Sequence, residues 1–324
     1  MKVLVTGGAG YIGSHVVAAL GARGYDVLVY DNLSTGYRDS LLCGRLIVGD
    51  LGDTGKLDRT IREYGPDAVM HFAGSIQVGE SVLDPLKYYS NNSVNTINLL
   101  DAMMRHGVAR FIFSSTAAVY GDPKTVPITE DEPVKPINPY GESKAFIETV
   151  LRDLSLVKDF RYIALRYFNA SGADLQARIG ERHDPETHLI PLVLKTAKGD
   201  REQIGVNGTD YPTADGTCIR DYIHVVDLAE AHLLSLDYLG DGGNSDVFNC
   251  GYGHGYSVNE VIQTVRKVTG KEFRVVESAR RPGDPPVLVA DSAKLKSRMN
   301  WNPRHDDLDF IVQTAWEWEK KSRP

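Results

Sequence analysis

The sequence predicts an α/β fold, a Rossmann-type doubly wound parallel sheet with a smaller mixed C-terminal lobe. Short β-branched runs alternate with amphipathic helical patterns over the first half of the chain. This alternation is typical of a parallel sheet that is covered on both faces. The segment 170–218 is instead rich in Gly, Asp, Pro and Thr. We therefore expect residues 1–169 to form the sheet domain and 170–324 a second lobe, with 219–250 returning to the first.

The composition restricts the class of protein before any motif is considered. The chain has 324 residues, a formal net charge of -7 and no long basic run, so we expect no nucleic-acid partner. Cys43, Cys218 and Cys250 are odd in number and lack a C-x-x-C spacing, so we expect neither a disulfide framework nor a metal site. No apolar run approaches the roughly 18 residues of a membrane span. We expect a cytoplasmic protein without a membrane partner.

The N-terminal segment predicts a strand, a glycine turn, a helix and a second strand. An apolar run at 2–6 leads into Gly7-Gly8-Ala9-Gly10-Tyr11-Ile12-Gly13, and an amphipathic pattern at 12–23 precedes the strand at 26–30. The glycines allow a tight turn, close approach of backbone N–H groups to a pyrophosphate, and close packing of helix on strand. Asp31 follows the second strand, where a carboxylate can bind an adenosine ribose and would repel a 2′-phosphate. The segment therefore predicts a dinucleotide site that prefers NAD to NADP.

Polar residues recur where the predicted strands end. Further strands are expected at 45–49, 67–72, 110–114 and 161–168, with helices at 57–64 and 85–106 between them. Open α/β sheets bind ligands at the carboxyl ends of their strands, and the polar residues found there are Asp31, Asp50, Thr116 and Asn169. Asp50 can be a partner of an adenine amine or an ordinary turn aspartate, and the sequence leaves both interpretations open.

Tyr140 and Lys144 form a candidate acid–base pair. Asn138 is a preferred N-cap residue and Pro139 suits the first helical position, so a helix is expected to begin here. Residues four apart on a helix share a face. Because a neighbouring cation favours the phenolate, it lowers the pKa of a tyrosine. The pair therefore predicts a general base that removes a proton from a hydroxyl group.

The C-terminal half predicts a less regular lobe. Helices are expected at 189–198, 227–239, 257–269 and 307–321, and strands at 220–225 and 247–250, the latter in the main sheet. The chain then crosses between the lobes more than once. A cleft between two lobes is a usual place for a ligand.

Together these motifs resemble the extended short-chain dehydrogenase/reductase family. The motifs in order are Thr6-Gly7-Gly8-x-Gly10-Tyr11-Ile12-Gly13, Asp31-Asn32, His71-Phe72-Ala73-Gly74, Ser114-Ser115-Thr116, Tyr140-x-x-x-Lys144 and Arg166-Tyr167-Phe168-Asn169. Others resemble more narrowly its UDP-glucose 4-epimerase branch: Val78-Gly79-Glu80-Ser81, Tyr211-Pro212-Thr213, Asp215-Gly216-Thr217, Arg220-Asp221-Tyr222-Ile223-His224-Val225 and Arg280-Arg281-x-Gly283-Asp284. The resemblance covers essentially the whole chain.

The resemblance implies a reversible 4-epimerisation of UDP-galactose and UDP-glucose through a transient 4-keto sugar. NAD would stay tightly bound and be recycled in each turnover, with residues 1–169 binding NAD and 170–324 binding the UDP-sugar. Tyr140 would remove the proton of the sugar 4-hydroxyl, and Thr116 would bridge that proton. Lys144 and the positive nicotinamide would lower the Tyr140 pKa, and Lys144 would also hold the nicotinamide ribose.

The same resemblance implies two sets of contact residues. The cofactor contacts are Gly7, Gly10, Tyr11, Ile12, Gly13, Asp31, Asn32, Asp50, Leu51, Phe72, Ala73, Gly74, Asn91, Ser114, Tyr140, Lys144 and Tyr167. The substrate contacts are Thr116, Tyr140, Asn169, Leu189, Arg220, Arg281, Asp284 and Leu288. Bidentate guanidinium groups of Arg220 and Arg281 suit the UDP phosphates, although both could instead form surface ion pairs. Asp284 would reach the uridine ribose.

Departures from the family pattern leave alternatives open. Ile76 stands where some members have Lys, His188 where some have Asn, and Asn207 where some have an aromatic residue. Ala117 and Ala118 follow Thr116 and cannot supply the acid and base that a 4,6-dehydratase needs. A uronate or pentose 4-epimerase, a decarboxylase and a non-catalytic NAD-binding regulator remain alternatives.

Two further expectations concern substrate breadth and assembly. Leu288 borders the expected hexose position, where related enzymes restricted to plain hexoses can have Tyr, so UDP-N-acetylhexosamines are expected as additional substrates. The helices at roughly 85–106 and 140–157 pair across dimers in similar proteins. We therefore expect a homodimer.

Overall fold

A seven-stranded parallel sheet with the strand order β11-β6-β5-β4-β1-β2-β3 forms the centre of the chain. The computed structural model describes residues 1–281 and 284–322, so Gly283 of the 280–284 motif lies outside the described residues. The strands are β1 (Lys2–Thr6), β2 (Asp26–Asp31), β3 (Arg45–Val48), β4 (Ala68–His71), β5 (Arg110–Thr116), β6 (Arg161–Tyr167) and β11 (Asp246–Cys250). The strand order reverses between β1 and β4, which confirms the predicted doubly wound sheet.

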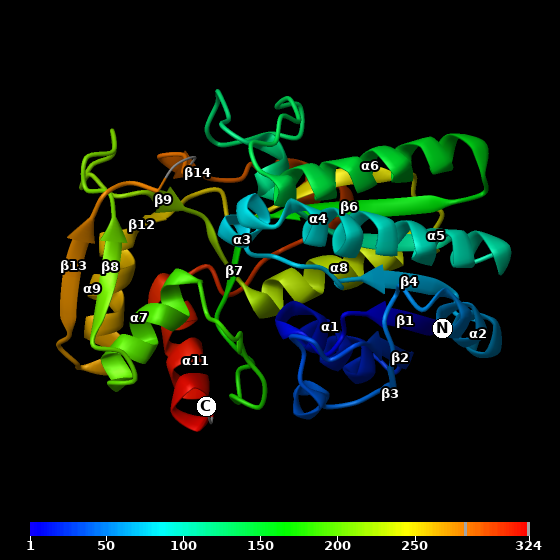
Figure 1. The fold of residues 1–324 in the computed structure, drawn as a ribbon, viewed down its shortest axis with the longest axis horizontal. Helices are drawn as coiled ribbons and strands as arrows, with labels where there is room; N and C mark the ends of the chain where they lie inside the picture. Colours follow the sequence, from blue (N-terminus) through cyan, green and yellow to red (C-terminus); the bar gives the residue numbers. More distant parts are fainter. Residues whose placement is uncertain (282–283, 323–324) are drawn as a thin grey trace.

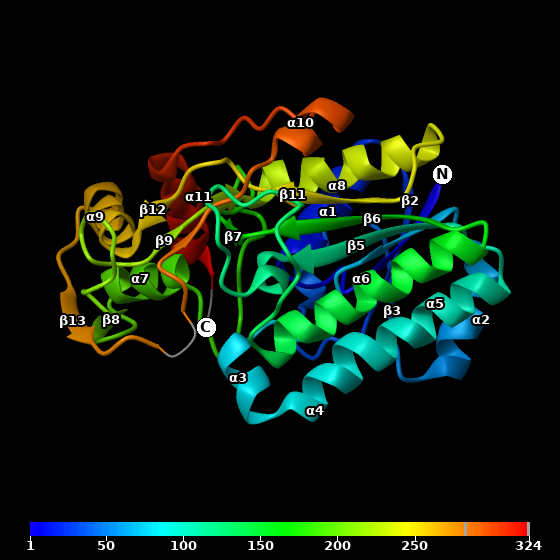
Figure 2. The same ribbon diagram turned by 90° about the horizontal axis from the view of Figure 1, so that it is seen from above.

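Helices cover both faces of this sheet (Figures 1 and 2). On one face α1 (Tyr11–Ala22) packs against α8 (Val225–Gly240), and on the other lie α2 (Thr54–Tyr64), α5 (Asn95–Arg105) and α6 (Pro139–Val157). Successive residues of a strand point to opposite faces, so Val3 and Val5 of β1 belong to the first core and Leu4 to the second. Both faces are buried, which explains the continuous apolar runs that predicted these strands.

The long helix expected at 85–106 is confirmed in outline but has a complex start. A short helix α3 (Val78–Leu83), which the sequence did not predict, precedes α4 (Pro85–Tyr88). A π-helical turn (Tyr89–Val94) then joins α4 to α5. Such turns insert an extra residue per turn and are frequent at functional sites. Two 3₁₀ turns, Arg38–Ser40 and Ala117–Tyr120, follow β2 and β5.

The smaller lobe lies beside the carboxyl ends of the strands (Figure 2). Two pairs of strands belong to it: β8 (Gln203–Asn207) with β13 (Arg274–Ser278), and β7 (Asn169–Ser171) with β10 (Tyr222–His224). A third sheet has the strand order β12 (Tyr256–Ser257), β9 (Ile219–Arg220) and β14 (Val287–Leu288). The helices of this lobe are α7 (Leu189–Lys198), α9 (Val258–Thr269) and α11 (Leu308–Lys321). Helix α10 (Ala293–Met299) lies near β11. Among the helices of residues 1–281 and 284–322, none is long and apolar enough to cross a membrane.

The single strand expected at 220–225 is wrong, because the chain divides there into β9 and β10 of two different sheets. The division falls at Asp221, whose fully buried carboxylate accepts backbone N–H bonds from Tyr252 (2.9 Å), Gly253 (3.1 Å) and Ala290 (3.2 Å). A buried carboxylate must be satisfied in this way to offset its desolvation. Asp221 therefore ties three distant segments together where the two lobes meet.

Candidate active site

The glycine turn after β1 leaves the N-terminus of α1 open. Gly7 has φ +73, and a Cβ there would lie 2.3 Å from the backbone nitrogen of Ala73. A Cβ on Gly13 would lie 2.2 Å from the Gly7 carbonyl oxygen, so both positions require glycine. Gly10 is the N-cap of α1, and a Cβ there would meet the same oxygen at a tolerable 3.4 Å. The exposed end of a helix attracts anions through its free N–H groups and its dipole, so this turn fits the pyrophosphate of a dinucleotide.

The predicted ribose and adenine residues lie together beyond β2 and β3. Asp31 accepts hydrogen bonds from the backbone N–H groups of Ala9 (2.9 Å) and Leu33 (2.8 Å). Burial raises the pKa of the Asp31 carboxyl, whereas these two donors lower it. Asn32 donates from Nδ2 to Asp50 Oδ2 (2.7 Å), and Asp50 Oδ1 accepts from the Gly52 N–H (2.7 Å). Asp50 thus forms a turn, and its other oxygen lies beside Asn32 at the same edge of the sheet.

The three candidate catalytic side chains converge from β5 and α6. Asn138 caps α6 by accepting from the Gly141 N–H (2.9 Å), and Pro139 begins the helix as predicted. Tyr140 is 9% exposed, and the side chain of Thr116 lies close enough to its hydroxyl to lower the Tyr140 pKa. Lys144 is 4% exposed, and its Nζ donates to the Ser114 carbonyl oxygen at 2.9 Å. The structure therefore places a phenol, a hydroxyl and an ammonium within one buried site.

The pKa of Tyr140 bears on an expectation from the sequence. Burial raises this pKa, and the neighbouring Thr116 side chain lowers it by less. Burial also lowers the pKa of Lys144 to about 8. In the chain alone, desolvation of the phenolate is the larger effect, and the Lys144 ammonium bonds to the Ser114 carbonyl oxygen. The predicted lowering of the Tyr140 pKa by Lys144 together with a bound nicotinamide stays a prediction.

Residues that the sequence analysis missed hold α6 in place. Asn92, in the π-helical turn, accepts from the Ser75 N–H (2.7 Å) and donates from Nδ2 to Ser143 Oγ (3.1 Å) on α6. Its predicted neighbour Asn91 donates to Ser75 Oγ (3.0 Å). Two consecutive asparagines within a helical pattern could have indicated this irregular turn in the sequence, because Asn side chains compete with the helix for backbone hydrogen-bond partners.

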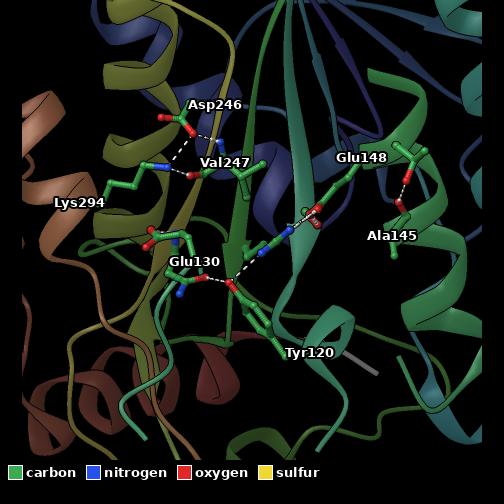
Figure 3. Close-up of polar contacts among 11 residues, drawn as sticks. Tyr120, Glu130, Ala145, Glu148, Asp246, Val247 and Lys294 are labelled. Atoms are coloured by element: carbon green, nitrogen blue, oxygen red, sulfur yellow. Dashed lines mark hydrogen bonds and ion pairs between the residues drawn. The ribbon is translucent and has the colours of Figure 1, made fainter. Parts of the chain in front are cut away.

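A buried ion pair also connects α6 to the sheet. Arg166 of β6 donates from Nη2 to Glu148 Oε2 (2.5 Å) and from Nε to Glu148 Oε1 (3.0 Å). Ser115 Oγ donates to the same carboxylate (2.5 Å), and Arg166 Nη1 donates to the Tyr120 hydroxyl (2.9 Å). Figure 3 shows the contacts of Glu148 and Tyr120. The pair fixes the helix that carries Tyr140 and Lys144 against β5 and β6.

The two candidate phosphate-binding arginines share a carboxylate. Arg220 and Arg281 both form ion pairs with Asp284, the latter at 3.1 Å between Nη2 and Oδ2. Arg281 and Asp284 line a cavity of about 610 Å³ together with Tyr211 and Arg280. Two of the three predicted residues, Arg281 and Asp284, therefore line a cavity, and Arg220 is joined to them through Asp284. The interpretation of both arginines as ion-pair residues also holds.

The remaining substrate candidates lie on three elements at the junction of the lobes. Asn169 of β7 donates from Nδ2 to the Asp221 carbonyl oxygen (3.2 Å). Leu288 of β14 lies opposite Arg220 in the sheet and packs against the cluster that contains Ala117 and Tyr120. It therefore borders the turn that follows Thr116. Leu189 is half-buried at the first position of α7.

The chain is similar to known proteins over its whole length. Residues 3–251 match the model of the NAD dependent epimerase/dehydratase family. The chain is 51% identical over 320 residues to a UDP-glucose 4-epimerase of Azospirillum brasilense, covering 98% of this chain and 92% of that protein. A structure of UDP-glucose 4-epimerase from Brucella ovis in complex with NAD aligns with a TM-score of 0.96 and 48% identity, over 98% of both chains. One from Bifidobacterium longum in complex with NAD+ and UDP aligns with a TM-score of 0.95 and 40% identity, over 99% and 98%.

Proposed function

The chain belongs to the NAD dependent epimerase/dehydratase family, and from that premise we propose that it interconverts UDP-galactose and UDP-glucose with NAD. The observation that carries this proposal is the meeting of Tyr140, Thr116 and Lys144 at one buried point. The two residues after Thr116 are Ala117 and Ala118, which have no proton to transfer. A redox step at C4 without elimination is therefore the chemistry that this site supports best.

In the proposed reaction, the Tyr140 phenolate removes the proton of the sugar 4-hydroxyl, with the Thr116 hydroxyl bonded between the groups. Lys144 and the positive nicotinamide of bound NAD would together offset the burial that raises the Tyr140 pKa. NAD, held by the glycine turn and Asp31, would supply the acceptor for the C4 hydride and the donor that returns it to the opposite face of the keto sugar. Tyr140 then gives its proton back to the new hydroxyl, so that no proton or electron is gained overall. Burial of Tyr140 and Lys144 keeps water from the site, which strengthens these electrostatic interactions.

The substrate diphosphate is assigned to Arg220 and Arg281. Both guanidinium groups now share the Asp284 carboxylate, and a diphosphate offers each of them further anionic oxygens with bidentate geometry. Asp284 would then be free to accept from the uridine ribose. Leu189 and Asn169 complete the assigned contacts to uracil and to the pyrophosphate–sugar region.

The proposed function is tested by incubating the purified chain with UDP-galactose and no added nucleotide. We expect UDP-glucose to form, because the cofactor is recycled and remains bound through purification. Denaturing the same sample should release NAD(H) into the supernatant. Net NADH production, or a protein that carries no NAD(H) and needs it added, would contradict the recycling of a bound cofactor.

Substrate breadth is predicted to depend on Leu288. Leu lacks the outer ring atoms and the hydroxyl of Tyr, so we expect epimerisation of UDP-N-acetylglucosamine beside that of UDP-glucose. In Leu288→Tyr the overpacked site should reject the N-acetyl group by ~1–3 kcal/mol, roughly one to two decades in rate. The measurement is the ratio of kcat/KM for the N-acetylated and plain substrates.

The matched control is Leu288→Met, which conserves the side-chain volume. It should leave that ratio near the value of the unmodified chain. If the ratio stays unchanged in Leu288→Tyr as well, Leu288 does not border the hexose.

A homodimer is proposed on the basis of apolar side chains on α3, α4, α5 and α6. Neighbouring exposed residues include Leu83 at 87%, Leu86 at 75% and, on α6, Phe146 at 47%. Adjacent apolar residues on one surface commonly mark an interface. These helices pack side by side (Figure 2).

Leu86→Glu is therefore expected to convert the dimer to a monomer, measured by sedimentation. Leu175→Glu, at a 54% exposed position outside these helices, is the control that should leave the assembly unchanged. A monomeric unmodified chain, or a Leu86→Glu variant that still dimerises as tightly, would contradict this interface.

The proposed division of labour assigns cofactor binding to residues 1–169 and UDP-sugar binding to 170–324. Residues 219–250 include α8, which packs on the seven-stranded sheet, and β11, which extends it. This supports their assignment to the first unit.

We also propose a cytoplasmic location. The three cysteines are unpaired thiols, two of them buried, as suits a reducing compartment.

A further inference from the structure

Four potential metal ligands meet in the loop between β7 and α7. Glu181, His183, Glu186 and His188 each offer one nitrogen or oxygen atom, and these atoms lie within 4.8 Å of one another. His188 is the N-cap of α7, and the ring centroid of His183 lies 6.4 Å from that of Tyr11 in the glycine turn. The cluster therefore lies between the cofactor turn and the second lobe, and the proposed reaction uses none of its four side chains chemically.

Four distances between histidine nitrogens and carboxylate oxygens, which include both oxygens of Glu186, are close to those of a tetrahedral site. His188 Nδ1 lies 2.8 Å from Glu181 Oε1 and 2.9 Å from Glu186 Oε1. His183 Nδ1 lies 3.2 Å from Glu181 Oε1 and 3.6 Å from Glu186 Oε2. Ligands about 2.0 Å from a tetrahedral Zn²⁺ are separated from one another by about 3.3 Å. The observed distances bracket this value, so an ion could enter with small side-chain movements.

Hydrogen bonding satisfies the cluster only in part: Glu186 Oε1 accepts from the backbone N–H groups of Thr187 (2.7 Å) and His188 (2.9 Å), but other atoms of the cluster lack such partners. An imidazole Nδ1 carries at most one proton, yet His188 Nδ1 faces two carboxylate oxygens at nearly equal distances. Within the described residues, His183 Nδ1 and Glu186 Oε2 have no hydrogen-bond partner. The Glu186 side chain is 3% exposed and that of Glu181 7%. Buried polar atoms left without partners are costly, and a cation at their centre would satisfy all of them.

The charges of the two carboxylates and the two histidines also favour a cation at the centre of the cluster. The two histidine rings lie with centroids 5.1 Å apart and both face the Glu181 and Glu186 carboxylates. Two protonated imidazoles would balance the two carboxylates, but like charges at this separation repel each other. One divalent ion and two neutral imidazoles balance the two carboxylates equally well without that repulsion. Because the ion must displace protons, its binding should weaken in acid.

We propose that Glu181, His183, Glu186 and His188 bind one divalent transition-metal ion of the Zn²⁺ type. Four protein ligands leave no open position, so the site is structural. The His188 side chain is 40% exposed, which provides a path for the ion. Cysteine spacing alone predicted no metal site, and the four residues here are glutamates and histidines.

The ion would stabilise the loop between β7 and α7, which already contacts both lobes. Trp318 of α11 donates to the Glu181 carbonyl oxygen at 2.9 Å. Arg182 pairs with Asp39 at 2.7 Å, and its guanidinium lies 3.4 Å from the Tyr37 ring centroid beyond β2. Metal binding should therefore raise the thermal stability of the whole chain, because an ion that binds only the folded state stabilises it.

The test uses the full chain without an affinity tag, after removal of metal with a chelator. Titration with Co²⁺ should produce the visible absorption of tetrahedral cobalt, saturating at one ion per chain, and Zn²⁺ should displace it. Zn²⁺ alone should raise Tm. In His183→Gln and Glu186→Gln the affinity should fall by more than the roughly 10–100-fold typical of outer partners. His254→Gln, which alters a lone exposed His–Asp306 pair of 2.7 Å, should bind as tightly as the unmodified chain.

Cobalt absorption of the unmodified chain decides the question even if a variant fails to fold. If the metal-depleted chain takes up no Co²⁺ with this spectrum, the four residues form an ion-pair network and the proposal is wrong. Equal uptake by the unmodified chain and a folded His183→Gln variant would also overturn it. Epimerase activity is not the readout, so neither result depends on the proposed function.

Discussion

Tyr140→Phe is expected to lose turnover while NAD remains bound. The Tyr140 ring is buried and meets Tyr88 edge-on, with ring centroids 6.4 Å apart, and Phe keeps that packing. The substitution removes the hydroxyl that lies beside Thr116 and that we propose as the acid–base group. General acid–base groups contribute roughly 10²–10⁴-fold, so kcat with UDP-galactose should fall by at least about 10²-fold. The NAD(H) released on denaturation should stay at one equivalent per chain.

Tyr88→Phe is the matched control. Its hydroxyl lies within hydrogen-bond distance of the Gln77 carbonyl oxygen (2.7 Å) and Glu80 Oε2 (2.9 Å) and can donate to either of them. This variant also loses a phenolic hydroxyl next to the site, but it should retain most of its kcat. Comparable kcat values for the two variants would show that Tyr140 is not the acid–base group, and a Tyr140→Phe variant without NAD would show a structural rather than a chemical defect.

The parts of the site that the sequence predicted depend on local chemistry. Gly7 and Gly13 are required by the turn in which they stand, and Asn138 with Pro139 sets the start of α6 within a few residues. Asp31 follows directly from the end of a buried strand. In each case the neighbouring residues determine the conformation, so the pattern alone was sufficient.

The parts that the sequence did not predict depend on contacts between distant segments. The division of the expected 220–225 strand requires backbone N–H groups of Tyr252, Gly253 and Ala290 around Asp221. Strand β8 was missed because it pairs with β13, some seventy residues later in the chain. The raised pKa of Tyr140 follows from burial, which is a property of the packed structure.

Glu148→Ala is expected to produce the largest loss of stability among these substitutions. The side chains of Glu148 and Arg166 are 8% and 6% exposed, so Ala would leave the guanidinium buried without its counter-ion. Removing one partner of a buried ion pair typically costs about 3–5 kcal/mol. The free energy of unfolding, measured with urea, should fall by this amount. Turnover should fall too, because Glu148 anchors α6 behind Tyr140 and Lys144.

Two controls separate loss of the pair from loss of the side chain. Replacing both partners, as in Glu148→Leu with Arg166→Met, removes the unpaired charge, and apolar replacements of buried pairs are often neutral. The double variant should therefore be more stable than Glu148→Ala. Arg152→Ala breaks an exposed pair with Asp153, both 62% exposed, and such pairs contribute about 0–1 kcal/mol. If Glu148→Ala costs no more than Arg152→Ala, the buried pair does not hold α6 on the sheet, and the orientation of Tyr140 must depend on the Asn92 and Asn138 contacts instead.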